Sequence, residues 1–197
     1  GVGAATDFIQ FVRSGADATG IDLTHAAIEH AKKRLSLEEK KANLLQADAE
    51  KLPFEDNSFD FIYSWGVLHH SPDTNETIEE VYRTLKSGGE TTIMLYHKYS
   101  FVTAYCLLYR GLLNGELRKK SLQQIISEQS EWDPQNPLTK VYSKGDLKKM
   151  FSRFTKIHIT VVPTKSYGTG IISKIFSILN KLLPGGGWYI IINAHKP

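Results

Sequence analysis

The chain has 197 residues, 41% of them hydrophobic and 23% charged, with a formal net charge of +3 at neutral pH. That composition fits one globular domain, and the lack of any dense lysine and arginine block argues against nucleic-acid binding through a broad basic face. One cysteine, Cys106, excludes an internal disulfide and a multi-thiolate metal site, and no apolar run reaches the roughly 18 to 20 residues that span a bilayer.

The first 97 residues predict helices and strands that alternate with short connections. Thr24 is a suitable N-cap for the second helix, and Gly15 would end the first. The predicted elements are a helix Thr6–Ser14, a strand Ala18–Leu23, a helix Thr24–Leu35, strands Leu44–Gln46 and Phe59–Ser64, a helix Asp73–Leu85 that ends in Gly88-Gly89, and a strand Glu90–His97. This order predicts an α/β fold with a Rossmann-like, doubly wound, mostly parallel sheet.

After His97 the chain changes character, and we interpret 98–140 as a helical insertion, a lid, within a single domain 1–197. The insertion comprises an apolar helix Tyr99–Leu113, a polar amphipathic helix Glu116–Ser130 and a proline-punctuated loop Trp132–Pro137. Regular elements then resume, with a helix Lys144–Phe154 capped by Ser143, a strand Lys156–Val162, an apolar helix Gly170–Leu183 and an antiparallel last strand Trp188–Ala194.

Polar residues follow the predicted strands at their carboxyl ends. Asp22 ends one strand, Asp48 follows the next, and a turn with Trp65, Gly66 and two histidines comes after the third. In open α/β sheets the ligand crevice lies at these strand ends. The run from Gln46 to Gly89 is therefore expected to form much of a ligand site.

Four segments together resemble the class I S-adenosylmethionine-dependent methyltransferases, and in particular the subfamily of ubiquinone and menaquinone C-methyltransferases. They are the glycine-rich Gly1–Thr6, the acidic Gly20–Thr24, the adenine-side Gln46–Phe54, and the pair Phe59–His70 and Tyr82–Gly89. The match covers roughly the first half of the chain and is specific as a set. Ser87 stands where the family usually has proline, a change that we expect to be harmless.

The resemblance implies S-adenosyl-L-methionine as cofactor and S-adenosyl-L-homocysteine as product. Asp22 would accept both ribose hydroxyls, Asp48 would accept from the adenine amino group, and the Ala49 N–H would donate to a ring nitrogen. The cofactor-binding residues implied are Gly1, Gly3, Asp22, Leu23, Asp48, Ala49, Ser64, Trp65 and Gly66.

His70 and His97 are the candidate catalytic residues, each with a structural alternative. Methyl transfer from a sulfonium relies mainly on positioning, so a base is needed only if the acceptor must lose a proton. A packing role for His70 and a hydrogen-bonded strand-end role for His97 are the competing interpretations. Adjacent side chains such as His69 and His70 point different ways and chelate poorly, so no metal is expected.

The expected activity is methyl transfer to a small molecule, with O-, C- and N-methylation all open, and a hydrophobic acceptor such as a lipid or quinone precursor is one option. We expect a cytoplasmic protein with no nucleic-acid partner, disfavour membrane contact, and keep a homodimer as an option. A catalytically silent subunit that retains the fold is the main alternative. A nicotinamide-dependent enzyme is disfavoured because Asp48-Ala49 and Leu85–Gly89 would have no role in it.

The chain opens inside the glycine-rich loop, whereas the resembled family has a strand before that loop. We therefore expect an N-terminally truncated chain whose first, central strand is missing. The second and fourth strands of the family sheet would then each present an unpaired edge. Weak binding of S-adenosylmethionine, or a gap filled by another segment or chain, would follow.

Overall fold

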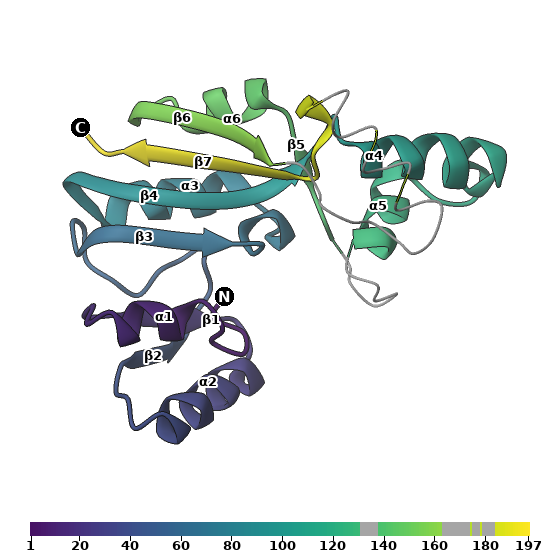
Figure 1. Ribbon diagram of the computed structural model, residues 1–197. Helices are drawn as coiled ribbons and strands as arrows, with labels where there is room; N and C mark the ends of the chain where they lie inside the picture. Colours follow the sequence, from purple (N-terminus) through teal and green to yellow (C-terminus); the bar gives the residue numbers. More distant parts are fainter. Residues whose placement is uncertain (131–137, 163–173, 175–177, 179–183) are drawn as a thin grey trace. The chain divides into compact units, whose positions relative to one another are not determined.

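The computed structural model describes residues 1–130, 138–162, 174, 178 and 184–197, which fall into two compact units (Figure 1). The first unit is Gly1–Asp56 and the second is Asn57–Pro197. Each unit contains its own sheet. The single domain 1–197 with an insertion at 98–140 stays a prediction.

The first unit is a short parallel sheet with two helices. Its elements are α1 (Phe8–Arg13), β1 (Thr19–Asp22), α2 (His25–Leu37) and β2 (Asn43–Gln46). The two strands pair in parallel from Thr19 opposite Asn43 to Asp22 opposite Gln46. Thr24 caps α2 as predicted, because the Ala27 N–H donates to its hydroxyl at 3.3 Å.

The second unit contains a five-stranded sheet in the order β3-β4-β7-β6, with β5 also paired to β4 (Figure 1). Its elements outside the insertion are β3 (Phe59–Trp65), the 3-10 helix η1 (Leu68–His70), α3 (Thr74–Thr84), β4 (Leu85–His97), β5 (Val141–Tyr142), α6 (Lys144–Met150), β6 (Thr155–Val162), the 3-10 helix η4 (Pro184–Gly186) and β7 (Tyr189–His195). β3 and β5 run parallel to β4, whereas β7 runs antiparallel to β4 and β6. The predicted antiparallel last strand is confirmed, and among the described strands β1 pairs only with β2 and β3 only with β4.

The predicted start of the strand at Glu90 is wrong, because β4 begins at Leu85 and runs through Gly88 and Gly89. The C-terminal segment pairs with this stretch: the Gly88 N–H donates to the Lys196 carbonyl and the Lys196 N–H donates to the Gly89 carbonyl, both at 3.0 Å. Gly88 has a φ of +78°, and the register with β3 shifts from Phe59 opposite Leu85 to Phe61 opposite Glu90, so β4 bulges here. Lys86 also pairs with Asp60 of the neighbouring strand at 2.9 Å.

The insertion is helical, as predicted for its first part. Its elements are α4 (Phe101–Tyr105), the π-helix η2 (Cys106–Leu113), the 3-10 helix η3 (Glu116–Arg118) and α5 (Leu122–Ser130). The continuous helix predicted for Glu116–Ser130 is wrong: the Gln124 N–H donates to the Ser121 hydroxyl and the Ser121 N–H to the Gln124 side chain, which starts a new helix. The loop predicted at Trp132–Pro137 and nearly all of the helix predicted at Gly170–Leu183 lie outside the described residues.

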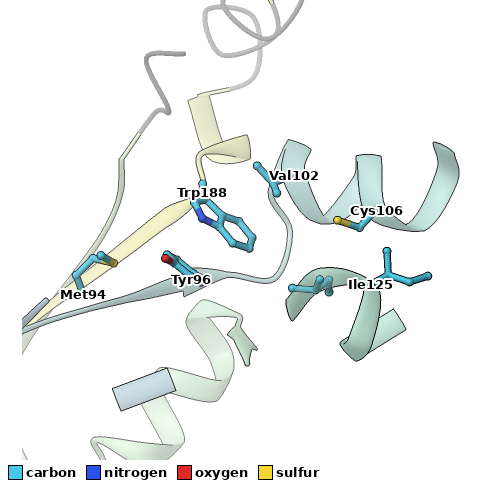
Figure 2. Packing of buried hydrophobic residues seen from close by; sticks show 7 residues of the cluster. Met94, Tyr96, Val102, Cys106, Ile125 and Trp188 are labelled. Atoms are coloured by element: carbon cyan, nitrogen blue, oxygen red, sulfur yellow. The ribbon is translucent and has the colours of Figure 1, made fainter. Parts of the chain in front are cut away.

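A buried cluster joins the insertion to the end of the sheet (Figure 2). Trp188 stacks on Tyr96 with ring centroids 4.4 Å apart, and Val102 and Cys106 from the insertion pack with Ile125 of α5. Burial raises the pKa of the Cys106 thiol to about 11, so this cysteine stays protonated at neutral pH. The expectation that the thiol is buried is confirmed, and its inertness stays a prediction.

Arg110 ties three elements of the insertion together. Its guanidinium donates to both carboxylate oxygens of Glu116, at 2.9 and 2.7 Å, and to Glu128 at 3.0 Å. A further bond reaches the Ile125 carbonyl at 3.3 Å. The bidentate, partly buried geometry makes this network stronger than an exposed ion pair.

Replacing Arg110 with leucine is expected to lower the free energy of unfolding by about 2 kcal/mol, because the partly buried Glu116 carboxylate loses its cation and Glu128 keeps only Lys120. Amide hydrogen exchange in α5 should also speed up, since η2 and α5 lose their shared bond. Arg118→Leu, at an exposed position of η3, is the matched control and should change neither quantity. Equal effects of the two substitutions would contradict a structural role for the network.

Candidate functional site

The Asp22 carboxylate at the end of β1 is held by three hydrogen bonds. The Gly3 N–H donates to Oδ2 at 3.0 Å, and the N–H and hydroxyl of Thr24 donate to Oδ1 at 3.0 and 2.9 Å. A carboxylate has about four acceptor positions, so one remains, on Oδ2. The predicted glycine loop and the predicted acidic residue are thus in direct contact.

The pKa of Asp22 lies below its ordinary value. Partial burial acts to raise this pKa, but the hydrogen bonds from Thr24 and Gly3 favour the charged form and outweigh it. The carboxylate is therefore ionised at neutral pH. Gly3 has a φ of +49°, a left-handed conformation that glycine adopts readily and that turns its N–H toward Asp22.

The other predicted residues of the first unit lie on the loops that follow β1 and β2. Leu23 is 65% exposed, and its carbonyl accepts from the Gln46 side chain at 3.0 Å. Asp48 is exposed, and its Oδ1 accepts from the Glu50 N–H at 2.9 Å. The Ala47 N–H donates to the Asp22 carbonyl at 2.9 Å, which fixes the loop of Asp48 and Ala49 beside the end of β1.

In the second unit the predicted residues Ser64, Trp65 and Gly66 end β3. The Ser64 hydroxyl is buried and has no hydrogen-bond partner within the described part of the chain. Trp65 is partly exposed and stacks on Tyr63 with ring centroids 6.1 Å apart. Gly66 has a φ of +71°, which a residue with a Cβ adopts only with strain, so this turn requires glycine.

The two adjacent histidines of η1 differ sharply in environment. His70 lies with Nδ1 2.8 Å from the Leu138 carbonyl, to which it donates, and is partly buried. His69 is 0% exposed, and neither ring nitrogen has a partner among the described residues. Its ring instead lies 4.0 Å from that of Tyr96 and 4.2 Å from that of His70, centroid to centroid. The expectation that the two side chains point different ways is therefore wrong, because the two rings pack against each other.

His69 was not among the site residues predicted from the sequence, although its environment is unusual. Burial lowers its pKa to about 2, with a smaller contribution from His70, so the imidazole is neutral across the physiological range. The available signal was the apolar run Gly66-Val67-Leu68 directly before it, which places one of two consecutive histidines inside. Within the described ranges, no group of three or more His, Cys, Asp or Glu side chains is arranged to hold a metal ion.

His97 ends β4 and is almost completely buried. Its Nδ1 lies 3.2 Å from the Gly187 carbonyl, and its backbone N–H donates to the Trp188 carbonyl at 2.7 Å. Burial lowers its pKa, the bond to Gly187 acts in the opposite direction, and Lys144 lowers it further. Donation from Nδ1–H selects the tautomer in which Nε2 carries the lone pair.

Comparison with known proteins gives the family context. Residues 1–93 match the family model described as a methyltransferase domain. Demethylmenaquinone methyltransferase of Staphylococcus aureus is 33% identical over 155 residues, which are 76% of this chain and 61% of the relative. Phosphoethanolamine N-methyltransferase 2 of Caenorhabditis elegans is 38% identical over 86 residues, 43% of this chain and 20% of the relative.

A solved structure shares the fold. Phosphoethanolamine N-methyltransferase 2 of Haemonchus contortus, in complex with phosphomonomethylethanolamine and S-adenosylhomocysteine, aligns with a TM-score of 0.69 at 19% identity, covering 100% of this chain and 47% of that one. The chain thus spans 61% and 20% of the two curated relatives described above. The chain is therefore similar to methyltransferases in the sequence of residues 1–93 and in its fold.

Proposed function

We propose that this chain binds S-adenosylmethionine and transfers its methyl group to a small-molecule acceptor. The observation that carries the proposal is the Asp22 carboxylate, which Gly3 and Thr24 hold in its charged form with one acceptor position left. A fixed carboxylate at the end of a parallel strand suits a ribose hydroxyl. The family match over residues 1–93 adds to this support.

The first unit would bind the adenosine part of the cofactor. Asp22 Oδ2 would accept from one ribose hydroxyl, and Oδ1 would accept from the second once the Thr24 hydroxyl rotates away. The exposed Leu23 side chain offers apolar surface to the adenine. Asp48 would accept from the adenine amino group, and the Ala49 N–H would donate to a ring nitrogen.

Further cofactor roles are proposed for Gly1 and for Ser64, Trp65 and Gly66. The Ser64 hydroxyl supports its own role, because it is buried with no partner among the described residues and a polar ligand group would satisfy it. The left-handed turn at Gly66 also leaves that backbone without a Cβ.

The bound cofactor supplies a methyl group on a positively charged sulfur, so its leaving group is already activated. The chain's own residues then have to orient the acceptor and exclude water. His97 is the better proton acceptor of the two proposed, because burial keeps its imidazole neutral and its bond to Gly187 leaves the lone pair on Nε2. His70 is the second candidate, although its bond to Leu138 supports a structural role.

The acceptor is proposed only as a small molecule. The relatives' names refer to demethylmenaquinone and to phosphoethanolamine, which are both small molecules of different polarity. These names support the class of acceptor and leave the acceptor atom open.

The test is to look for co-purified cofactor by mass spectrometry and to titrate the purified chain with S-adenosylmethionine and S-adenosylhomocysteine by calorimetry. We expect a saturable site for both. NADH is the matched control ligand and should give no binding heat. Absence of any binding would refute the proposal, and binding without methyl transfer in an acceptor screen would favour the silent-subunit alternative.

A further inference from the structure

The continuous helix of α4 and η2, residues 101–113, has two contrasting faces. Its inner face, with Val102, Cys106 and Gly111, is buried against α5 and the end of the sheet. Its outer face carries large apolar side chains that are exposed. They are Leu107, Leu108, Tyr109, Leu112 and Leu113, and the most exposed is Leu113, at 78%.

This outer face carries no charge. Arg110 is the single charged residue of 101–113, and its guanidinium turns inward to Glu116 and Glu128. A surface helix of a globular protein normally presents charged or polar residues to water. A contiguous, uncharged face of leucines is instead typical of a surface that another phase or molecule covers.

The π-helical geometry brings these leucines together. The Asn114 N–H donates to the Tyr109 carbonyl, five residues back, at 2.9 Å. In a helix with this wider turn, residues four and five apart share a face, so Leu108, Leu112 and Leu113 lie together. Sustained π-helix is rare and is frequently found at functional sites.

Basic side chains flank the apolar face at both ends of the helix. Lys98 precedes it, next to Tyr99, which is 69% exposed. Arg118 and Lys119 are exposed on the segment that follows it. Between residues 98 and 130 the sequence has five basic and two acidic residues, and Arg110 engages both acids, Glu116 and Glu128. The exposed charge around the face is therefore positive.

We propose that the outer face of the α4–η2 helix docks on an anionic lipid surface, with the helix lying in the plane of the interface. A helix with leucines on one face and flanking lysine and arginine binds in this way, and its affinity rises with anionic lipid. Exposed tyrosine also suits the headgroup level. Such docking needs no spanning segment, and among the described residues no helix is both long and apolar enough to cross a membrane.

The experiment is flotation of the chain with vesicles of phosphatidylcholine, with and without phosphatidylglycerol as the anionic lipid. We expect the chain to float with the anionic vesicles and to be released by salt. The double variant Leu108→Asp/Leu112→Asp should bind at least about tenfold more weakly, because two inserted apolar side chains are replaced by like-charged ones. Leu37→Asp, at an exposed leucine of α2 in the first unit, is the matched control and should leave binding unchanged.

The basic flank is tested separately by Arg118→Glu/Lys119→Glu, with Lys40→Glu/Lys41→Glu as a control of equal charge change at exposed positions of the first unit. Only the former pair should weaken vesicle binding. Circular dichroism of every variant establishes that it is folded. The proposal is overturned if the chain stays soluble with both vesicles, or if the leucine variant binds as well as the parent. Loss of self-association in the leucine variant, without vesicle binding, would assign the face to a second copy of this chain instead.

Discussion

Replacing Asp22 with alanine is expected to weaken binding of S-adenosylmethionine by about 100-fold or more. The ribose hydroxyl of the cofactor would lose its charge-assisted hydrogen bond to the carboxylate, which is worth about 1.5 to 3 kcal/mol. The substitution also releases the Gly3 N–H and the Thr24 cap, which Asp22 holds in place. Since each 1.4 kcal/mol corresponds to a factor of about ten, these losses together reach two orders of magnitude. Calorimetric titration of the parent and the variant measures the change.

Asp17→Ala is the control for the loss of one carboxylate, because Asp17 is exposed in the loop before β1. It should leave the affinity unchanged. Asp22→Asn retains the shape and one acceptor oxygen, so it should lie between the parent and the alanine variant. Unchanged binding by Asp22→Ala would refute the proposed ribose site.

The lowered pKa of Asp22 also predicts how this site responds to acid. A carboxyl whose pKa is lower in the folded chain stabilises the fold above its unfolded pKa, which is about 3.9. That contribution is lost as the pH falls through the folded pKa. Cofactor affinity should therefore show no loss attributable to Asp22 between pH 8 and about pH 5.

Substituting His69 is expected to remove most of an acid-induced destabilisation of the second unit. The pKa of His69 is about 2 in the folded chain and about 6.5 when unfolded, so between these values the unfolded state binds the extra proton. Stability is therefore full above about pH 6.5 and falls as the pH decreases toward 2. From pH 7 to pH 5 this single histidine should cost about 2 kcal/mol.

The measurement is urea unfolding followed by tryptophan fluorescence at several pH values. All three tryptophans, Trp65, Trp132 and Trp188, fall in the second unit. In His69→Leu and His69→Phe the free energy of unfolding should vary much less between pH 7 and pH 5. Both variants also remove two buried ring nitrogens that have no partner within the described part of the chain, so neither leaves a new unsatisfied group there.

The pH slope is the deciding quantity, because a larger or smaller apolar side chain changes the absolute stability by itself. His97, whose pKa is also lowered, should leave a smaller residual slope in both variants. His30→Phe, at an exposed position of α2, should keep the parent slope. An unchanged slope in the His69 variants would contradict the prediction, because it would show that His69 does not cause the pH dependence of the free energy of unfolding.

Local hydrogen bonding explains why parts of the fold were predictable. Thr24 and Ser143 were predicted as N-caps, and both side chains accept from the first turn of their helices. Asp22 was predicted at a strand end beside a glycine loop, and it accepts from Gly3. The partners in each helix cap are at most three residues apart, so the local sequence contains the whole interaction.

Two predicted boundaries differ from the structure. The strand predicted from Glu90 begins at Leu85, where Lys196, far along the chain, pairs with Gly88 and Gly89. The segment Glu116–Ser130 has the pattern of one helix, but Ser121 and Gln124 form a local cap that begins a second helix. A distant partner accompanies the first difference, and a local side-chain bond accompanies the second.

The sequence by itself indicated the resemblance to methyltransferases, most of the strands and helices in their order, and the acidic residues at the strand ends. These follow from short-range patterns: periodicity, capping residues and motif spacing. Only the tertiary structure decided that His69 is buried with no partner among the described residues while His70 bonds to Leu138, and that the leucines of η2 face outward while Arg110 turns inward. Burial depends on which distant segments pack on a residue, and a local pattern specifies that packing only in part.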